Sequence, residues 1–204
     1  MAENYLRQSP LAHLSPGSRA KFSDTEENPG LIIEEQKNLA LLVIRGDPKN
    51  KKLVTKIKSV IGLPLPKPLS YAEGKGRRIL WMGPDEFLIM APQNEFALIS
   101  DQIIEFSKNQ GYATADISDS LCILGIRGKF ARETLMKGCS LDFISPDFSI
   151  GSVVSTIFEK MPITIIQLNS TAENNVFQIL LNRSYAHHFW LWLETSSKEY
   201  FEIQ

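Results

Sequence analysis

The feature of the sequence that most limits its fold is a pattern that occurs twice. An apolar strand ending in Ile-Arg-Gly, at 44–46 and again at 126–128, leads each time into a helix that a glycine ends. A hairpin and an amphipathic helix follow in both halves, so each half has the element order β-α-β-β-α. We therefore expect an α+β fold, a single pseudo-duplicated module with antiparallel or mixed sheets. Its halves are expected at about 31–111 and 112–204.

The first half begins with the run Leu39–Ile44, in which every residue is apolar. Both faces of such a strand must be buried, which places it inside a sheet. Asp47 is predicted to be the N-cap of the following helix, with Pro48 at its first position. Gly62 and Pro64 are predicted to end that helix. Its apolar stripe consists of Leu53, Ile57, Val60 and Ile61.

Turn residues divide several of the strands into pairs. Strands at 79–82 and 86–91 flank a Gly-Pro-Asp turn, which predicts a hairpin. In the same way, strands at 113–117 and 121–126 are expected to pair around Ser118-Asp119-Ser120.

The second half ends in a helix that Ser184 is predicted to cap. Phe189 and Trp190 lie on its apolar side. Trp192 is two positions from Trp190 and cannot share that face, so it is expected to point elsewhere, for example into a partner. This half also contains three expected strands, at 153–158, 163–168 and 176–181.

Residues 1–30 are polar and broken by proline and glycine, which predicts an extended N-terminal arm rather than a packed element. Within this arm, Ser9–Leu14 carries a small apolar patch. We interpret the patch either as a frayed terminus or as a contact for a partner. Residues 31–204 are expected to form the folded module.

The overall composition excludes several classes of protein. The net charge is −1, so the chain lacks the basic surface of a typical nucleic-acid binder. No apolar run approaches the roughly 20 residues that span a bilayer, and the start of the chain lacks the apolar segment of a secretion signal. We expect a cytoplasmic protein with no membrane and no nucleic-acid partner.

No group of residues in the sequence forms recognisable catalytic machinery. His187 and His188 are adjacent, so on a helix they diverge by about 100° and do not easily bind one metal ion together. Cys122 lies in an apolar strand and is expected to be a core residue. Cys139 follows a helix-ending glycine, where the helix dipole opposes a thiolate. We expect no metal or cofactor on this chain.

Two basic stretches allow more than one interpretation. The outer face of the first helix carries four lysines, which indicate a solvated face or, alternatively, a polyanion site. The loop Gly74–Arg78 lacks the spacing of a phosphate-binding glycine loop. Phosphate binding through Lys75, Arg77 and Arg78 is nevertheless an alternative to a plain surface loop. The four helix lysines are Lys51, Lys52, Lys56 and Lys58.

A few large or charged side chains suit docking rather than catalysis. Trp81 and Trp192 belong to a residue type that is enriched in interface hot spots. Arg183 precedes the final helix, and its guanidinium can bind a carboxylate of this chain or of a partner.

Four stretches, taken together, resemble a known family. Trp81–Leu88 is similar to the segment W-x-G-P-D-E-W/F-L of the gamma subunit of heterotetrameric sarcosine oxidase. Leu135–Asp142 resembles L-x-K-G-C-x-L-D in that family, and Phe177–Ala186 resembles f-x-l-l-v-x-R-S-f-A. Ser9-Pro10-Leu11 also fits, so the resemblance runs from about residue 9 to residue 195. The order and spacing of the stretches carry it, more than any single motif.

The resemblance implies a fold similar to the folate-binding domain of glycine-cleavage aminomethyltransferases, in agreement with the internal repeat. It implies a non-catalytic subunit that stabilises assembly with alpha, beta and delta subunits. The complex would demethylate sarcosine to glycine and pass the one-carbon unit to tetrahydrofolate, with FAD, FMN, NAD and tetrahydrofolate on the partner subunits. The interface candidates are Trp81, Asp85, Cys139, Asp142, Arg183, Ser184 and Trp192.

Alternatives to this function stay open. The implied fold also suits a stand-alone folate-binding or aminomethyltransferase-like module. Related complexes that oxidise N-methylglutamate or dimethylglycine have similar small subunits, so the amine is not determined. The arm and the connector at 64–78 depart from the family pattern, which bears on the mode of docking. Self-association of the isolated chain is a further alternative.

Overall fold

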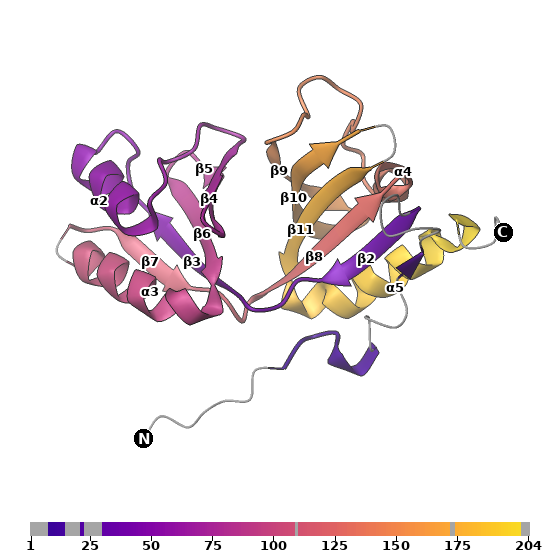
Figure 1. Cartoon of the computed structure of the whole chain (residues 1–204), viewed down its shortest axis with the longest axis horizontal. Helices are drawn as coiled ribbons and strands as arrows, with labels where there is room; N and C mark the ends of the chain where they lie inside the picture. The colour runs from indigo at the N-terminus through magenta and orange to yellow at the C-terminus, as the bar shows by residue number, and fades with distance from the viewer. Residues whose placement is uncertain (1–7, 15–20, 23–29, 109, 172–173, 201–204) are drawn as a thin grey trace. The chain divides into compact units, whose positions relative to one another are not determined.

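A computed structural model of the chain describes residues 8–14, 21–22, 30–108, 110–171 and 174–200. These residues form two compact units (Figure 1). The middle unit contains 38–118 together with 151–154. The terminal unit contains the described residues that precede 38, together with 119–150 and those from 155 onward.

The middle unit is built on a five-stranded antiparallel sheet and two helices. Their bounds are β3 Leu39–Arg45, α2 Lys51–Ile61, β4 Tyr71–Gly74, β5 Arg77–Gly83, β6 Glu86–Pro92, α3 Gln93–Lys108 and β7 Ala113–Asp116. The strand order is β4-β5-β6-β3-β7. β3 pairs with β6 on one side and with β7 on the other, so the apolar run lies inside the sheet as predicted. Helix and strand side chains share one core, in which Leu42, Leu53 and Ile103 have no exposed surface.

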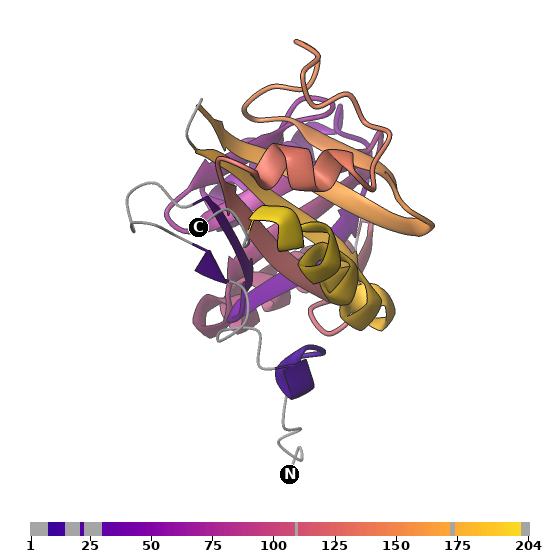
Figure 2. The same ribbon diagram turned by 90° about the vertical axis from the view of Figure 1, so that its right-hand side faces the viewer.

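The terminal unit is built on a six-stranded sheet with the order β1-β2-β8-β11-β10-β9. Its strands are β1 Lys21–Phe22, β2 Leu31–Glu35, β8 Leu121–Gly128, β9 Val153–Phe158, β10 Met161–Ser170 and β11 Asn175–Asn182. Its helices and 3-10 turns are η1 Ala12–Leu14, α4 Ala131–Met136, η2 Arg183–Tyr185, α5 Ala186–Ser196 and η3 Lys198–Tyr200. Figure 2 shows α4 and α5 on the same face of this sheet. Aromatic contacts join α5 to the sheet, among them Phe158 with Phe189 at 4.7 Å between ring centres.

The two sheets exchange one strand each. β2 precedes β3 in the sequence but pairs with β8, whereas β7 precedes β8 but pairs with β3. The predicted pairing of 113–117 with 121–126 is therefore wrong. The link between β7 and β8 is held at its two ends by different partners: Leu41 N donates to Ser118 Oγ at 2.9 Å, and Arg183 N donates to the Ser120 carbonyl at 2.9 Å. Because of this exchange, corresponding strands of the two repeats take the same positions in their sheets. The order β4-β5-β6-β3-β7 in one sheet matches β9-β10-β11-β8-β2 in the other.

Helix α2 begins later than the sequence indicates. Asn50 is its N-cap, and the Asn50 side chain accepts a hydrogen bond from Lys52 N at 3.0 Å. Asp47, the predicted cap, instead accepts from Lys49 N at 2.8 Å, a turn that short polar side chains favour before a helix. Gly62 ends the helix with φ at 82°, as predicted, because the left-handed conformation there suits glycine.

Candidate functional site

Trp81 and Asp85 lie on the hairpin β5–β6 of the middle unit. Trp81 is half-buried and packs against the core of that unit, and Trp81 N donates to the Ser70 carbonyl at 3.1 Å. Asp85 is exposed in the turn, where its carbonyl accepts from Gly46 N at 2.8 Å. A Cβ on Gly46 would lie 2.7 Å from the Tyr112 ring, so the turn is tightly seated. Trp81 shapes the hairpin, and Asp85 exposes its carboxylate in the turn.

Cys139 and Asp142 organise the connection between α4 and β9 in the terminal unit. Cys139 is 7% exposed and forms a backbone bridge with Phe158. The Asp142 carboxylate is exposed and accepts hydrogen bonds from Ile144 N at 2.9 Å and Ser145 N at 3.1 Å. Both residues therefore stabilise the conformation of this connection through contacts within it and with β9.

Trp192 packs beside the end of helix α4. Its ring meets the Phe158 ring edge to face at 4.6 Å. A Cβ added to Gly138 would lie 2.5 Å from Phe158 and 2.8 Å from Trp192, distances that real side chains do not tolerate. The glycine before Cys139 is thus required by close packing, and Trp192 is half-buried, whereas Trp190 is fully buried as predicted.

Arg183 and Ser184 lie in the turn η2. Arg183 donates through Nη2 to the Gln8 carbonyl, so its guanidinium holds a segment of its own chain. Ser184 is exposed and does not cap the last helix, which corrects the prediction. Helix α5 begins at Ala186 and is preceded by Tyr185 without a side-chain cap. The residue predicted as the cap lies in the turn η2. Helix α5 is held in place by its buried side chains rather than by a capping hydrogen bond.

Residues 8–14 dock on the terminal unit, which the sequence did not reveal. Leu11 is fully buried. Ser9 Oγ donates to the carboxylate of Glu35 at 2.6 Å, and the Glu35 side chain is only 7% exposed. The rings of His13 and His187 meet at 4.7 Å. The patch predicted to fray or to contact a partner thus packs on its own chain through Leu11. Most of the predicted arm, 1–30, lies outside the described residues.

The connection between α4 and β9, together with strand β9 itself, exposes three isoleucines. Ile144, Ile150 and Ile157 are 70%, 56% and 52% exposed, and we call them the apolar connection. β9 is the edge strand of its sheet, so one of its edges is not paired with another strand of that sheet. An exposed β-branched residue on an edge strand, such as Ile157, is typical of a contact surface.

Among the described residues, one thiol has a strongly shifted pKa and no acidic, cysteine or histidine side chains cluster as metal ligands do. Burial, with a smaller contribution from the Glu35 charge, raises the pKa of the Cys122 thiol to about 12, so the thiol stays protonated. Across the described residues, no three His, Cys, Asp or Glu side chains gather as a metal site requires. Within that same part of the chain, no helix combines the length and apolar character that a membrane crossing needs.

The basic loop of the middle unit is the tight turn of the hairpin β4–β5. Arg77 donates to Glu95 at 2.8 Å and to the Val60 and Ile61 carbonyls at the end of α2. Arg78 donates to Glu73 at 2.6 Å. Two of the three charges proposed for phosphate binding are therefore used within the unit, which disfavours that alternative.

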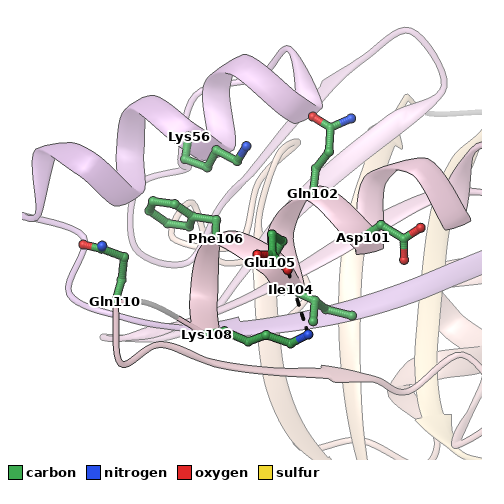
Figure 3. A pocket seen from close by; sticks show the side chains of 8 residues that line it. All are labelled: Lys56, Asp101, Gln102, Ile104, Glu105, Phe106, Lys108 and Gln110. Carbon is green, nitrogen blue, oxygen red and sulfur yellow. Dashed lines mark ion pairs between the residues drawn. The ribbon is translucent and has the colours of Figure 1, made fainter.

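A groove of about 740 Å³ opens between α2 and α3 of the middle unit (Figure 3). Lys56 Nζ on α2 lies 6.0 Å from the centre of the Phe106 ring, and Lys108 pairs with Glu105 at 3.9 Å. Most of the lining side chains are exposed, unlike those of an enclosed small-molecule site. The lining residues are Lys56, Asp101, Gln102, Ile104, Glu105, Phe106, Lys108 and Gln110.

Comparison with known proteins gives consistent results. The model of the sarcosine oxidase, gamma subunit family matches residues 45–199. Sarcosine oxidase subunit gamma of Corynebacterium sp. strain U-96 is 26% identical over 197 residues, 96% of this chain and 92% of the relative. A chain of the heterotetrameric sarcosine oxidase of Corynebacterium sp. U-96, solved with pyrrole 2-carboxylate, superposes with a TM-score of 0.83 at 24% identity, covering 98% of both chains.

A second solved structure shares the fold. Aminomethyltransferase T of the glycine cleavage system of Bartonella henselae superposes with a TM-score of 0.60 at 16% identity, over 92% of this chain and 57% of that one. The α+β fold expected from the internal repeat, with its likeness to aminomethyltransferases, is therefore confirmed.

Proposed function

The chain belongs to the sarcosine oxidase gamma subunit family, and from this we propose that it is the gamma subunit of a heterotetrameric sarcosine oxidase. In this proposal the chain has no active site of its own and stabilises the assembly of alpha, beta and delta subunits. Those partners hold FAD, FMN, NAD and tetrahydrofolate, and the complex demethylates sarcosine to glycine in the cytoplasm. The observation that carries the proposal is the match of the family over residues 45–199.

The arrangement of the side chains supports a structural role. The Cys122 thiol is held protonated, and the two closest histidine rings contact each other rather than a nucleophile. The guanidinium groups of Arg77 and Arg183 bind groups of the same chain. The reactive residue types are therefore used within the fold, as suits a subunit whose contribution is packing.

We divide the interface candidates into two kinds. Asp85, Ser184 and the exposed isoleucines of the apolar connection are free to contact a partner directly. The other candidates give those surfaces their shape, because their side chains are used in local contacts. These are Trp81, Asp142, Arg183, Trp192 and Cys139, whose thiol contacts the Thr156 hydroxyl.

Co-expression with tagged alpha, beta and delta subunits tests the proposal. We expect the chain to co-purify with the tagged subunit in a fixed ratio, and the yield of the complex to fall when the chain is left out. A chain that stays monomeric and never co-purifies with flavin-containing subunits would overturn the proposal.

A stand-alone folate-binding or aminomethyl-transfer module is a second candidate, favoured by the fold shared with aminomethyltransferase T. Calorimetric titration of the isolated chain with tetrahydrofolate separates the two. Measurable heat at millimolar ligand would support the second candidate, and its absence would favour the subunit. The same preparation, examined by light scattering, reports whether the isolated chain self-associates.

A further inference from the structure

Helix α2 and the turn before it carry a concentration of positive charge that forms no ion pair with another described residue. Five of the ten residues from 49 to 58 are lysines. All of them are exposed except Lys56, which is half-buried. Among the residues that the structure describes, none of the five forms an ion pair. The five, which we call the lysine face, are Lys49, Lys51, Lys52, Lys56 and Lys58.

The helix has no internal means of balancing this charge. It contains no acidic residue, and its first turn places Lys51 and Lys52 at the positive end of the helix dipole. Lys52 and Lys56 are four positions apart, so they repel each other across one turn. The Asp47 carboxylate, just before the helix, is bound by a backbone N–H. The lysines therefore oppose the stability of the helix that carries them.

Apolar side chains anchor the helix, and among the lysines Lys56 lies over the Phe106 ring. Leu53, Ile57 and Ile61 anchor the helix to the core, and they lie on the side opposite to the lysine face. Elsewhere in the described part of the middle unit, arginines are paired with glutamates: Arg45 with Glu86, and Arg77 with Glu95. A face that costs stability and is unpaired in the free chain is typical of a surface that another molecule neutralises.

The neighbouring groove limits where that molecule lies. Its α3 side carries Asp101, Glu105 and Lys108, so the groove adds no net positive charge to that of α2. An acidic surface therefore fits the outer side of α2, over Lys51, Lys52 and Lys58. A nucleic acid is disfavoured because the chain as a whole is slightly acidic.

We propose that the lysine face binds a carboxylate-rich surface of one of the larger oxidase subunits. The contact rests on the proposed function, because it needs the heterotetramer as its setting. It deepens that function by giving this subunit an electrostatic docking element. Opposite charges at such an interface speed association and fix its orientation.

Co-purification at increasing salt tests the contact. The quadruple variant K49Q/K51Q/K52Q/K58Q is compared with K67Q/K75Q/K160Q/K198Q, in which four exposed lysines outside α2 lose the same charge. Each variant is co-expressed with the tagged partner subunits, and the bound complex is washed at about 50 to 500 mM NaCl. We expect the first variant to show an apparent dissociation constant at least about tenfold higher than that of the second at low salt, with little further change as salt rises.

Three outcomes overturn the proposal in distinguishable ways. If the wild-type chain does not co-purify at all, the proposed function fails together with this contact. If it co-purifies with equal retention across the salt range, or if both variants are lost at the same salt concentration, only the contact fails. If the lysine face instead binds a labelled DNA duplex with the same loss in the first variant, the partner is a nucleic acid and the proposal is wrong. Thermal melts of both variants verify folding, and because repulsion is removed, the first is expected to melt no lower than wild type.

Discussion

The two repeats keep the same strand order but differ after their first helix. In the middle unit, α2 has 11 residues and is capped by Asn50 and Gly62, and nine residues lead to β4. In the terminal unit, α4 has six residues and no side-chain cap, and 16 residues lead to β9. In the middle unit the helix itself exposes lysines, whereas in the terminal unit the connection after the helix exposes isoleucines.

This difference shows how two repeats of the same fold come to have distinct surfaces. A capped helix with its own apolar stripe tolerates an unfavourable charge on its outer side. A short uncapped helix depends on tertiary packing, here the contact of Gly138 with Phe158 and Trp192. The sheets are retained because their strands are buried, and the helix-to-strand segments diverge because they face solvent.

The glycines that follow the two helices offer the largest test of this comparison. Gly138→Ala is expected to lower the free energy of unfolding by about 3 kcal/mol, because its Cβ meets Phe158 at 2.5 Å. Gly62→Ala is expected to cost about 1 kcal/mol, because only its left-handed backbone is strained and nothing lies within 4 Å. Urea denaturation measures both, and labelling of the Cys122 thiol, which is buried in the native state, reports the terminal unit.

Asparagine at the same positions is the control, because asparagine tolerates the left-handed conformation. Gly62→Asn is expected to recover part of the loss of Gly62→Ala, whereas Gly138→Asn is expected to be worse than Gly138→Ala. Equal losses for the two alanine variants would contradict the contrast between strain and packing.

The docked segment 8–14 is a second difference between the units. Leu11→Ala is expected to lower the free energy of unfolding by about 2 kcal/mol, at the low end for a buried leucine because the segment can detach rather than leave a cavity. Leu14→Ala, in the same segment but half-buried, is expected to cost less than about 1 kcal/mol. Thermal denaturation monitored by circular dichroism compares them. Similar losses for the two variants would show that Leu11 is not the anchor.

The apolar connection can be tested against an exposed leucine of the other unit. Ile144→Asp combined with Ile157→Asp is expected to raise the apparent dissociation constant from the partner subunits about tenfold, roughly 1.4 kcal/mol. Leu98→Asp is a matched control, because Leu98 is 68% exposed and Ile144 is 70% exposed. Retention on tagged partner subunits measures the effect. A larger loss from Leu98→Asp would move the apolar contact to the middle unit.

The smallest expected effect concerns the end of the terminal unit. A hydrogen bond from Lys137, together with its charge, lowers the pKa of Glu199. The contact therefore adds stability above the ordinary glutamate pKa, and this stability is lost as the pH falls through the lowered value. Glu199→Gln is expected to lower the Tm by about 1 °C at neutral pH, because the contact is exposed. The two melting temperatures should converge as the pH falls through the lowered pKa of Glu199, and a difference that persists in strong acid would contradict this origin.

Local sequence rules predicted individual elements well but not the partners of two strands. The apolar run Leu39–Ile44 and the helix end at Gly62 depend on neighbouring residues, and both predictions are confirmed. The exchange of β2 and β7 is not local, since Ile33 pairs with Ile126, far along the chain. The turn at 118–120 has the composition of a hairpin, but its ends are bound by different partners.

Side-chain contacts were likewise predictable where they depend on neighbouring residues and not where they join distant ones. Helical spacing separated Trp190 from Trp192 correctly, because both lie on one helix. The hydrogen bond from Ser9 to Glu35 joins residues that are 26 positions apart. The segment around Ser9 is polar and has no periodic pattern of apolar residues from which this contact could be predicted. The exposure of Ile144 could not be predicted either, because β-branched residues usually indicate a buried strand.

The strand exchange also imposes an order on synthesis at the ribosome. β2 is made more than 80 residues before β8, its partner, while β3 to β7 can already pair among themselves. Until β8 emerges, the apolar strand Leu31-Ile32-Ile33 lacks its longer partner and can pair with the two-residue strand β1. A break in the chain between β7 and β8 would therefore not separate two independent halves. It would leave the second fragment dependent on a strand donated by the first.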